Sequence, residues 1–451
     1  MGSETALVLF NRDLRVHDHP ALAAAAQAER TVPLFVFDER LLGSRFAAPN
    51  RVAFMLEALS DLDGRLRKMG ARLFVRRGDP VREAIVAARE CGATQLHVSA
   101  DWSAYARERE QRLARACEEE RIEFVAHPGV TVVPPGAVTP TGGDHFKVFS
   151  PYHRAWGDLP WREQLGAPRK LTPPSKLKAG RLPALDSLID GTPSPRRMPG
   201  GEGEGRKLMR AFLGDGVGRY EDRHDDLPGD ATSRLSAYIR WGCVSPLELA
   251  REASERRGGA AFVRQLCWRD FHHQVLAATP SLPRRDYRPR RDRWSRSERA
   301  LEAWREGRTG YPLVDAAMRQ LAEEGFMHNR ARMTVASFLC KDLYVDWREG
   351  AWHFWDLLSD GEIANNAGNW QWVAGTGNDT RPNRVLNPVR QAKRFDPDGV
   401  YVRRYLPELE SVRGKAIFEP WRMEGFERLD YPEPIVDHDE AAAAFKAHRG
   451  G

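Results

Sequence analysis

The first part of the chain, roughly 130 residues, alternates short β-branched runs with longer amphipathic stretches, and this alternation limits the fold more than any other feature. Strands separated by helical patterns form a parallel sheet with right-handed crossovers. The sequence therefore predicts an N-terminal α/β domain built on a doubly wound parallel sheet. The expected strands are 6–10, 32–37, 72–75, 95–98 and 123–126, and the clearest expected helices are 51–69 and 104–120.

No glycine-rich phosphate loop follows any of these expected strands. Neither G-x-G-x-x-G nor G-x-x-x-x-G-K-[ST] occurs there. A dinucleotide or triphosphate site of the usual kind is therefore not indicated. The α/β domain must bind another ligand or serve as a scaffold.

Proline and glycine become frequent after the last expected strand, as in PPGAVTPTGGDHF and GTPSPRRMPGGEGEG. These residues interrupt helices and strands, so the stretch is typical of an interdomain connector. Beyond residue 206 nearly every periodic stretch is helical and tryptophan is frequent. We expect an α/β domain at 1–128, a connector at 129–205 and an all-helical domain at 206–451.

Composition narrows the class of protein. A chain of 451 residues with 41% hydrophobic residues is too long for one compact core and can bury a large cofactor. The formal charge of +6 suits a polyanionic partner without requiring one. Five scattered cysteines without metal-ligand spacing predict reduced thiols in a cytoplasmic protein. We find neither a signal peptide nor an apolar run of about 18 residues, so no membrane span is expected.

Three segments in the last third of the chain are the most informative about function: RTGYPLVDAAMRQL, GFMHNRARMTVASFLCKDLYVDWREG and DGEIANNAGNWQW. In this order and spacing they resemble the flavin-binding core of the photolyase/cryptochrome family, and matches at 232–236 and 265–271 extend the resemblance. It implies a helical domain that binds FAD beside a pocket for a damaged pyrimidine pair. Light then drives an electron from reduced flavin into the lesion. Damaged DNA is the implied partner, and a monomer is expected.

The segment TSRLS at 232–236 predicts the start of a helix with a hydroxyl residue at the N-cap. Free backbone N–H groups and Arg234 would form an anion site there, suited to a pyrophosphate. Taken alone, such a segment is nearly always only a cap. The resemblance adds further contacts and places Asn366 beside flavin N5, where a side chain tunes the flavin redox state. Glu362 stands where family members more often have Asp. The expected FAD-binding residues are Tyr220, Thr232, Ser233, Arg234, Leu235, Ser236, Arg332, Asp360, Glu362 and Asn366.

Thirteen tryptophans are present, and their ordinary role is packing in cores and interfaces. Three of them match the electron-transfer chain of the family. The resemblance makes Trp370 the indole nearest the flavin, Trp347 the middle relay and Trp294 the outer donor. All three positions are filled, which favours a flavin that can be photoreduced.

Two helical segments match the lesion pocket of the family. Gln265, Trp268 and Arg269 share one helix face by their spacing, and so do Asn329 and Met333. Without the family, the second segment reads as a basic surface helix with Met333 in the core. The resemblance implies that Trp268 and Trp372 form aromatic walls, that Asn329 and Met333 line the pocket, and that Arg330 points towards DNA. His224 replaces a family arginine that is often near DNA.

Gln265 departs from the pattern of most cyclobutane-dimer photolyases, which have Glu at this position. Gln is more usual in (6-4) photolyases and animal-type cryptochromes. However, (6-4) photolyases have a pair of histidines at the positions of Asn329 and Met333 for acid–base chemistry. The sequence therefore favours cyclobutane-dimer repair. A cryptochrome-like blue-light sensor is the alternative, and a (6-4) photolyase comes third.

The α/β domain is the usual antenna site of the family. The Asn-Glu pair of folate-antenna members is lacking, whereas Asp101, Tyr105, Arg107 and Arg51 resemble deazaflavin-antenna members. We therefore favour 8-hydroxydeazaflavin over an empty site or folate. The adjacent histidines at 272 and 273 point about 100° apart on a helix, and no metal is predicted.

Overall fold

The computed structural model describes residues 4–175 and 177–450 of the chain. The chain forms two compact units, each assembled from separate segments. The first unit contains Met1–Pro193, Met198–Arg219 and Ser233–Pro280. The second contains Ser194–Arg197, Tyr220–Thr232 and Ser281–Gly451.

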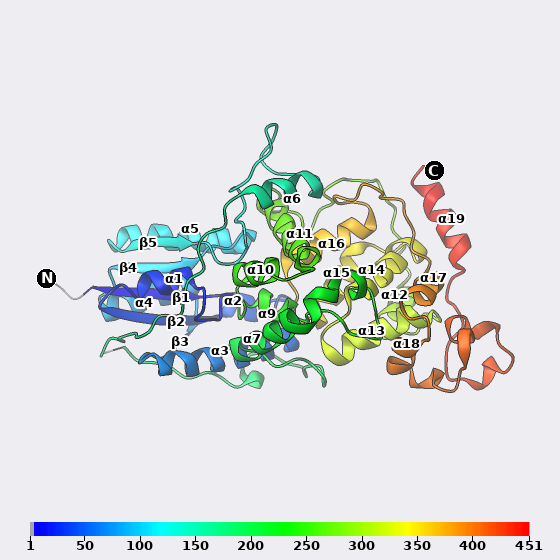
Figure 1. Ribbon diagram of the computed structural model, residues 1–451, viewed down its shortest axis with the longest axis horizontal. Helices are drawn as coiled ribbons and strands as arrows, with labels where there is room; N and C mark the ends of the chain where they lie inside the picture. The colour runs from blue at the N-terminus through cyan, green and yellow to red at the C-terminus, as the bar shows by residue number, and fades with distance from the viewer. Residues whose placement is uncertain (1–3, 176, 451) are drawn as a thin grey trace. The chain divides into compact units, whose positions relative to one another are not determined.

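The first unit is built on a five-stranded parallel sheet with the strand order β3-β2-β1-β4-β5 (Figure 1). The central strand is buried along its whole length, and Val8 lies opposite Pro33 on one side and His97 on the other. The predicted doubly wound sheet is confirmed. The strands are β1 (Thr5–Phe10), β2 (Arg30–Asp38), β3 (Phe74–Gly78), β4 (Gln95–Ser99) and β5 (Glu123–His127).

One strand is displaced from its expected range. We expected 72–75, whereas β3 begins at Phe74. The backbone N–H of Leu73 donates to the Asp63 carboxylate at 2.8 Å, so this group is not available to the sheet. A side-chain acceptor on a neighbouring helix thus sets where the strand begins.

Helices pack around this sheet (Figure 1), and the expected connector also contains helices. Local signals explain their limits: Asp79 caps the start of α4, Pro80 occupies its first turn, and Gly92 ends it in the left-handed conformation. α1 lies over β1, β4 and β5, and α4 lies over β2 and β3. The helices of this unit are α1 (Pro20–Ala25), α2 (Glu39–Leu42), α3 (Pro49–Lys68), α4 (Pro80–Cys91), α5 (Ala104–Glu119), α6 (Phe149–Asp158), α7 (Glu202–Ala211), α9 (Ser236–Arg240), α10 (Pro246–Ser254) and α11 (Gly259–Ala278).

Buried polar contacts join distant segments of the first unit. The guanidinium of Arg15, 1% exposed, donates to the backbone carbonyls of His17, Asp18, Gly129 and Gly242. These bonds connect the loop after β1 to the connector and to the segment before α10. The expected limits at 128 and 205 therefore fall inside this unit, which includes α7 and α9 to α11 as well.

The second unit is helical. α14 continues into a single π-helical turn at Phe338–Asp342. The hydrophobic core of the unit includes Trp304, Trp347 and Trp370. α13 packs on α14 and α18, and α15 packs on α16. The helices are α8 (Tyr220–Arg223), α12 (Glu298–Glu306), α13 (Pro312–Glu324), α14 (Asn329–Ser337), α15 (Trp347–Leu357), α16 (Ile363–Ala374), α17 (Pro388–Phe395), α18 (Val400–Tyr405) and α19 (His438–His448).

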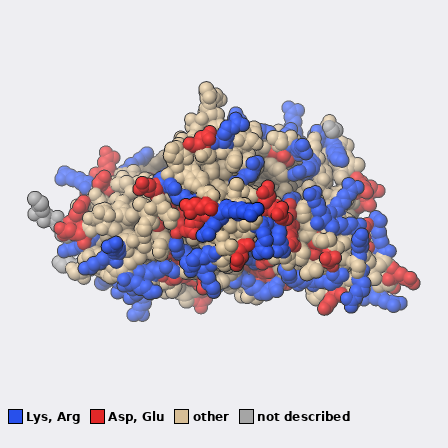
Figure 2. Space-filling model, viewed as in Figure 1, with Lys and Arg blue, Asp and Glu red and all other residues tan. Residues whose placement is uncertain are grey.

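Basic and acidic side chains are intermingled on the face of the protein shown in Figure 2. The excess of Lys and Arg is therefore spread over this face and does not form one continuous basic patch there. Within residues 4–175 and 177–450, no helix combines the length and the apolar character needed to cross a membrane.

Candidate functional site

A partly buried ion pair joins α14 to the turn between α15 and α16. Arg332 donates from its two terminal nitrogens to both carboxylate oxygens of Asp360, at 3.2 and 2.8 Å. Its Nε donates to the backbone carbonyl of Met327 at 2.7 Å. Asp360 is only 8% exposed. Burial of a carboxylate is costly unless the charge is paired, and Arg332 provides that pairing. The structure thus brings together two residues expected at the flavin.

The turn of Asp360 leads into α16, which carries two further expected residues. Glu362 lies at the start of this helix, is buried, and accepts a hydrogen bond from the side-chain amide of Asn365. One turn later, the Asn366 amide nitrogen donates to the backbone carbonyl of Ala351 at 2.9 Å. The Asn366 carbonyl oxygen is therefore the atom of this side chain that can accept a bond from a ligand.

The expected cap at 232–236 is wrong. α9 has five residues, begins at Ser236, has Leu235 at the N-cap and has no side-chain cap bond. Arg234 adopts a left-handed backbone (φ 51°), and the Ser233 hydroxyl accepts from the Leu235 N–H at 3.3 Å. The segment therefore forms a local serine turn, and its short helix provides no N-terminal anion site. Within the described part of the chain, the buried Thr232 hydroxyl has no hydrogen-bond partner.

Tyr220, another residue expected to bind flavin, lies at the start of α8. The Tyr220 ring stacks on His224, with ring centres 5.3 Å apart. Burial, together with the nearby Asp225 carboxylate, raises the pKa of Tyr220 to about 12, so its hydroxyl stays protonated at neutral pH. Asp225 also accepts two bonds from Arg330, at 3.0 and 2.6 Å. A phosphate would have to compete with this carboxylate for Arg330, whose role towards DNA stays a prediction.

The three expected relay tryptophans all belong to the second unit. Trp370 and Trp347 are 3% and 0% exposed, and Trp294 is half-buried against the same core. Gly350, one helical turn after Trp347, lies against the Trp370 ring so closely that a Cβ atom on Gly350 would clash with it. The α15 face that carries Trp347 therefore contacts Trp370.

Two polar contacts define the outer part of this tryptophan series. The Trp347 ring nitrogen donates to the Asp286 carboxylate at 2.9 Å, and the Arg348 guanidinium lies 4.7 Å from the Trp347 ring centre. Trp294 lies against Tyr344, three residues before Trp347, with ring centres 5.1 Å apart. Trp294 therefore contacts a residue three positions before Trp347, and Gly350, three positions after Trp347, contacts Trp370.

The expected lesion residues of the first unit lie on α11. Gln265 is exposed and Trp268 is half-buried. One face of Trp268 is covered by Phe149, with ring centres 3.6 Å apart and planes 4° apart. Arg269 donates to the Val130 carbonyl at 2.7 Å, which fixes its guanidinium to the connector.

The expected lesion residues of the second unit lie on α14 and α16. Asn329 is exposed at the start of α14, and Met333 is half-buried one turn later. Trp372 is half-buried, and the Arg384 guanidinium lies 5.3 Å from its ring centre.

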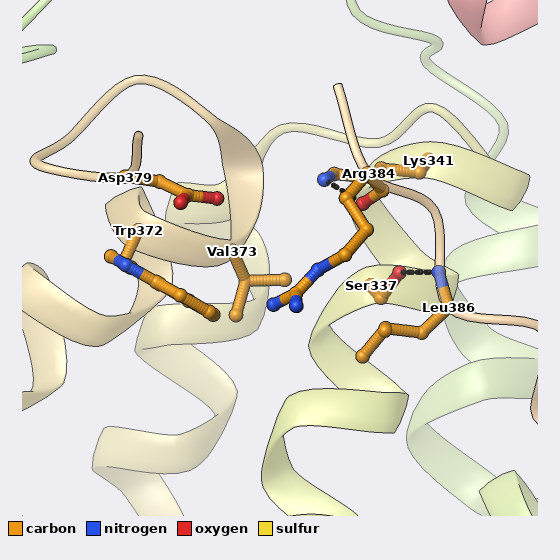
Figure 3. A pocket seen from close by; sticks show the side chains of 7 residues that line it. All are labelled: Ser337, Lys341, Trp372, Val373, Asp379, Arg384 and Leu386. Atoms are coloured by element: carbon orange, nitrogen blue, oxygen red, sulfur yellow. Dashed lines mark hydrogen bonds between the residues drawn. The ribbon is translucent and has the colours of Figure 1, made fainter. Parts of the chain in front are cut away.

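A small pocket adjoins Trp372 (Figure 3). Its size corresponds to about one water molecule, so it is a crevice beside the tryptophan and no flavin site. The buried Lys341 ammonium donates to the carbonyls of Pro382 and Arg384 at 3.1 and 2.6 Å, and burial lowers its pKa to about 8. Lys341 thereby positions the loop that carries Arg384. The lining residues are Ser337, Lys341, Trp372, Val373, Asp379, Arg384 and Leu386.

Polar side chains also gather between the end of β2 and α5. The Tyr105 hydroxyl donates to the Asp38 carboxylate, and the buried Arg109 has two nitrogens without hydrogen-bond partners among the described residues. Burial raises the pKa of Glu110 to about 7 despite the neighbouring Arg109. Asp101 accepts from Arg12 at 3.5 Å.

The other two residues of the antenna prediction make backbone contacts. Arg51 donates to the Phe46 carbonyl at 2.8 Å, and Arg107 donates to that of Ala277 at 3.1 Å. Among the described residues no cluster of His, Cys, Asp or Glu has the make-up of a metal site.

Known proteins resemble the chain over nearly its whole length. Residues 6–170 match the family model of DNA photolyase, and residues 262–449 match that of the FAD binding domain of DNA photolyase. A deoxyribodipyrimidine photo-lyase from Streptomyces griseus is 54% identical over 452 residues, which cover 99% of each chain. The chain belongs to the photolyase/cryptochrome family.

Solved structures of this family share the fold. The class III photolyase of Agrobacterium tumefaciens is 30% identical, with a TM-score of 0.92 and coverage of 99% of this chain and 97% of that one. The archaeal photolyase of Sulfolobus tokodaii, solved with two FAD molecules, is 31% identical, with a TM-score of 0.86 and coverage of 98% and 99%.

The residues present fit FAD, the cofactor of this family. The buried Thr232 hydroxyl lacks a hydrogen-bond partner among the described residues, and the Asn366 carbonyl oxygen remains an acceptor. Arg332 and Asp360 offer a paired charge that can bind polar groups without a large desolvation cost.

Sequence reasoning missed Phe149, Asp286 and Gly350, which contact Trp268, Trp347 and Trp370. No local signal marked Phe149 or Asp286, because their roles depend on long-range packing. A glycine inside a helical pattern could have drawn attention to Gly350.

Proposed function

We propose that this chain is a deoxyribodipyrimidine photo-lyase that uses light to split cyclobutane pyrimidine dimers in DNA. The main observation that supports this function is the match to the Streptomyces griseus enzyme over 99% of both chains. The residues agree with it, because Asn329 and Met333 cannot provide the paired-histidine chemistry of a (6-4) enzyme.

FAD would be held by residues of several segments. Bound FAD in its reduced form supplies, on illumination, the electron that opens the dimer. Arg332 and Asp360 bind its polar groups, Tyr220 and residues 232–236 contribute from their segment, and Glu362 adds a carboxylate. Asn366 is oriented by Ala351 so that its carbonyl oxygen can accept a hydrogen bond from an N–H group of the ligand.

The lesion is recognised by aromatic walls after the damaged pair leaves the base stack. A dimer stacks poorly with its neighbours, which lowers the extrusion cost of a few kcal/mol. Trp268 and Trp372 pack against the pyrimidines, and Arg269, Asn329 and Met333 line the pocket. Gln265 donates a hydrogen bond to a pyrimidine carbonyl, and it does so regardless of pH because its amide does not titrate. Arg330 contributes to the DNA surface.

Trp294, Trp347 and Trp370 form the inward electron path. The contact of Gly350 with Trp370 and the burial of Trp347 support short, dry steps between the inner two indoles. The partial exposure of Trp294 allows it to exchange electrons with solutes. These residues restore the reduced cofactor and take no part in splitting the dimer.

The polar cluster near β2 and α5 is the proposed antenna site. The Nε and Nη2 atoms of the buried Arg109, which donate no hydrogen bond among the described residues, suit a chromophore with oxygen acceptors. We favour 8-hydroxydeazaflavin over folate. The proposal places the antenna site within residues 1–128 and the FAD and lesion sites within 206–451, as functional regions that do not coincide with the two compact units. It also includes a monomeric state and a cytoplasmic location.

Separate repair assays test the function. The chemically reduced protein is illuminated with an oligonucleotide that carries a thymine dimer, and in parallel with one that carries a (6-4) lesion. We expect light-dependent repair of the first alone. Repair of the (6-4) lesion alone, or of neither lesion by flavin-loaded protein, would overturn the proposal.

A further inference from the structure

The connector residue Phe149 stacks face to face on Trp268 of α11. Its ring lies 3.6 Å from the Trp268 ring centre, nearly parallel to it. Phe271 meets both rings edge-on, at 5.8 Å from Phe149 and 5.6 Å from Trp268. Phe149 is 6% exposed, whereas Trp268 is half-buried. One face of Trp268 is therefore covered and its edge is supported.

Hydrogen bonds from α11 hold Phe149 in this position. Gln274 accepts from the Phe146 N–H at 2.9 Å and donates to the Phe146 carbonyl at 2.8 Å. Asp270 accepts from the Trp156 ring nitrogen at 3.0 Å. Residues on both sides of Phe149 are thus fixed to the helix that carries Trp268. These hydrogen bonds therefore help to hold the two rings in the stacked arrangement, which does not depend on ring contact alone.

We propose that Phe149 is a positioning residue for recognition of the lesion. By covering one face of Trp268 it fixes the plane of the indole and leaves the opposite face for the extruded pyrimidine pair. A side chain that is already immobile has little rotamer freedom to lose on binding. This inference rests on the proposed role of Trp268 as a lesion wall.

Arg264 provides a contrast on the same helix. It is exposed, and its guanidinium lies 5.1 Å from the Phe149 ring centre. An exposed cation next to the stack suits a phosphate, which has the same charge in damaged and undamaged DNA. Arg264→Ala should therefore weaken binding to both DNAs alike and leave their ratio unchanged.

The test compares dark binding of damaged and undamaged oligonucleotides by fluorescence anisotropy. Phe149→Leu removes the flat ring and should weaken binding to the thymine-dimer DNA by about three- to tenfold, the effect expected for a lost aromatic pair. Binding to undamaged DNA should not change. Phe149→Tyr keeps the stacking face and should keep the wild-type ratio of the affinity for damaged DNA to the affinity for undamaged DNA. Phe149→Met, whose unbranched apolar side chain adapts to irregular space, replaces Phe149→Leu if the latter unfolds.

Phe146→Leu is the matched control. Phe146 is a buried aromatic residue of the same segment that contacts Tyr152, with ring centres 5.7 Å apart. Its substitution should lower the melting temperature without altering the ratio of affinities. Trp268→Ala is the reference for the lesion wall.

The outcomes separate the two claims. A lower ratio of damaged-DNA to undamaged-DNA affinity in both Trp268→Ala and Phe149→Leu supports the inference. If this ratio falls in Trp268→Ala but is unchanged in folded Phe149→Leu or Phe149→Met, the inference is overturned. The role of Trp268 as a lesion wall then stands. An unchanged ratio in Trp268→Ala overturns the lesion wall, and the role of Phe149 with it.

Discussion

Gly350 of α15 lies against the indole of Trp370 on α16, and a Cβ atom at this glycine would overlap the Cη2 and Cζ3 atoms of the ring. The absence of a side chain at Gly350 is what lets the two helices approach at this point. Gly350→Ala should therefore lower the free energy of unfolding by about 1–3 kcal/mol through overpacking. Urea denaturation measures this change. The control is Gly64→Ala in α3, where a Cβ meets nothing within 4 Å, and there we expect a gain of about 0.4–1 kcal/mol. Equal effects at both sites would refute the packing argument.

Trp294→Phe should block photoreduction of the oxidised flavin and spare repair by chemically reduced enzyme. Phenylalanine is much harder to oxidise than indole, so the partly exposed end of the series is lost. Absorption spectra under light with an external thiol follow photoreduction, and a repair assay after dithionite reduction follows catalysis. Loss of both activities in Trp294→Phe would place this residue in the repair step itself.

Asp360→Asn should reduce the FAD content of the purified protein, because the variant loses the charged partner that holds Arg332. Loss of one such charge-assisted contact corresponds to about 1–3 kcal/mol. The cofactor content per chain is measured by absorbance after denaturation. Asp225→Asn is the control, since it breaks the equivalent pair with Arg330, for which no flavin contact is expected. Similar flavin loss in both variants would show a general effect on folding.

Acid should weaken the protein through Asp13. Burial alone would raise its pKa, but the charge of His19, 3.0 Å from the carboxylate, and the hydrogen bond from the Asn11 N–H lower it to about 2. Because the folded pKa lies below the unfolded value of about 3.9, the ionised carboxylate contributes about 2 kcal/mol above pH 5, and this is lost as the pH falls through 2. In urea denaturation, the stability gap between wild type and Asp13→Asn should shrink by about 1 kcal/mol from pH 5 to pH 3. A constant gap would mean that Asp13 is not ionised in the folded state.

Gln265→Glu should keep FAD and retain or raise repair of cyclobutane dimers, because it restores the side chain usual in that branch with almost no change in volume. A carboxylate must be protonated to donate a hydrogen bond, so repair by this variant should depend on pH where the wild type does not. Repair rates at several pH values decide the matter. Abolished repair in Gln265→Glu with FAD retained would show that the neutral amide is required.

The sequence predicted most of the fold because its signals are local. The alternation of β-branched runs and amphipathic stretches was enough for the five-stranded parallel sheet, and the helices expected at 51–69 and 104–120 correspond to α3 and α5. The start of β3 was wrong by two residues, since the Asp63 carboxylate that displaces it comes from another helix.

The candidate site was predictable only in part. The i, i+4 spacing placed Asn329 and Met333 on one face of α14, and the pairing of Arg332 with Asp360 brings two expected residues together. The cap at 232–236 failed because Arg234 takes a left-handed conformation that its residue type does not suggest. The stack of Phe149 on Trp268 joins positions more than a hundred residues apart, and no local pattern reports such contacts.

The chain passes between its two compact units at 193–194, 197–198, 219–220, 232–233 and 280–281. A single cut therefore cannot separate them into intact fragments. A fragment that begins at residue 206 would take α9 to α11 away from the carbonyl-bound Arg15 and the sheet on which their unit is built. The first unit is complete only once Pro280 has been synthesised, and the main segment of the second unit begins only at Ser281. Nascent chains shorter than 280 residues therefore leave both units unfinished and their apolar surfaces open to chaperones.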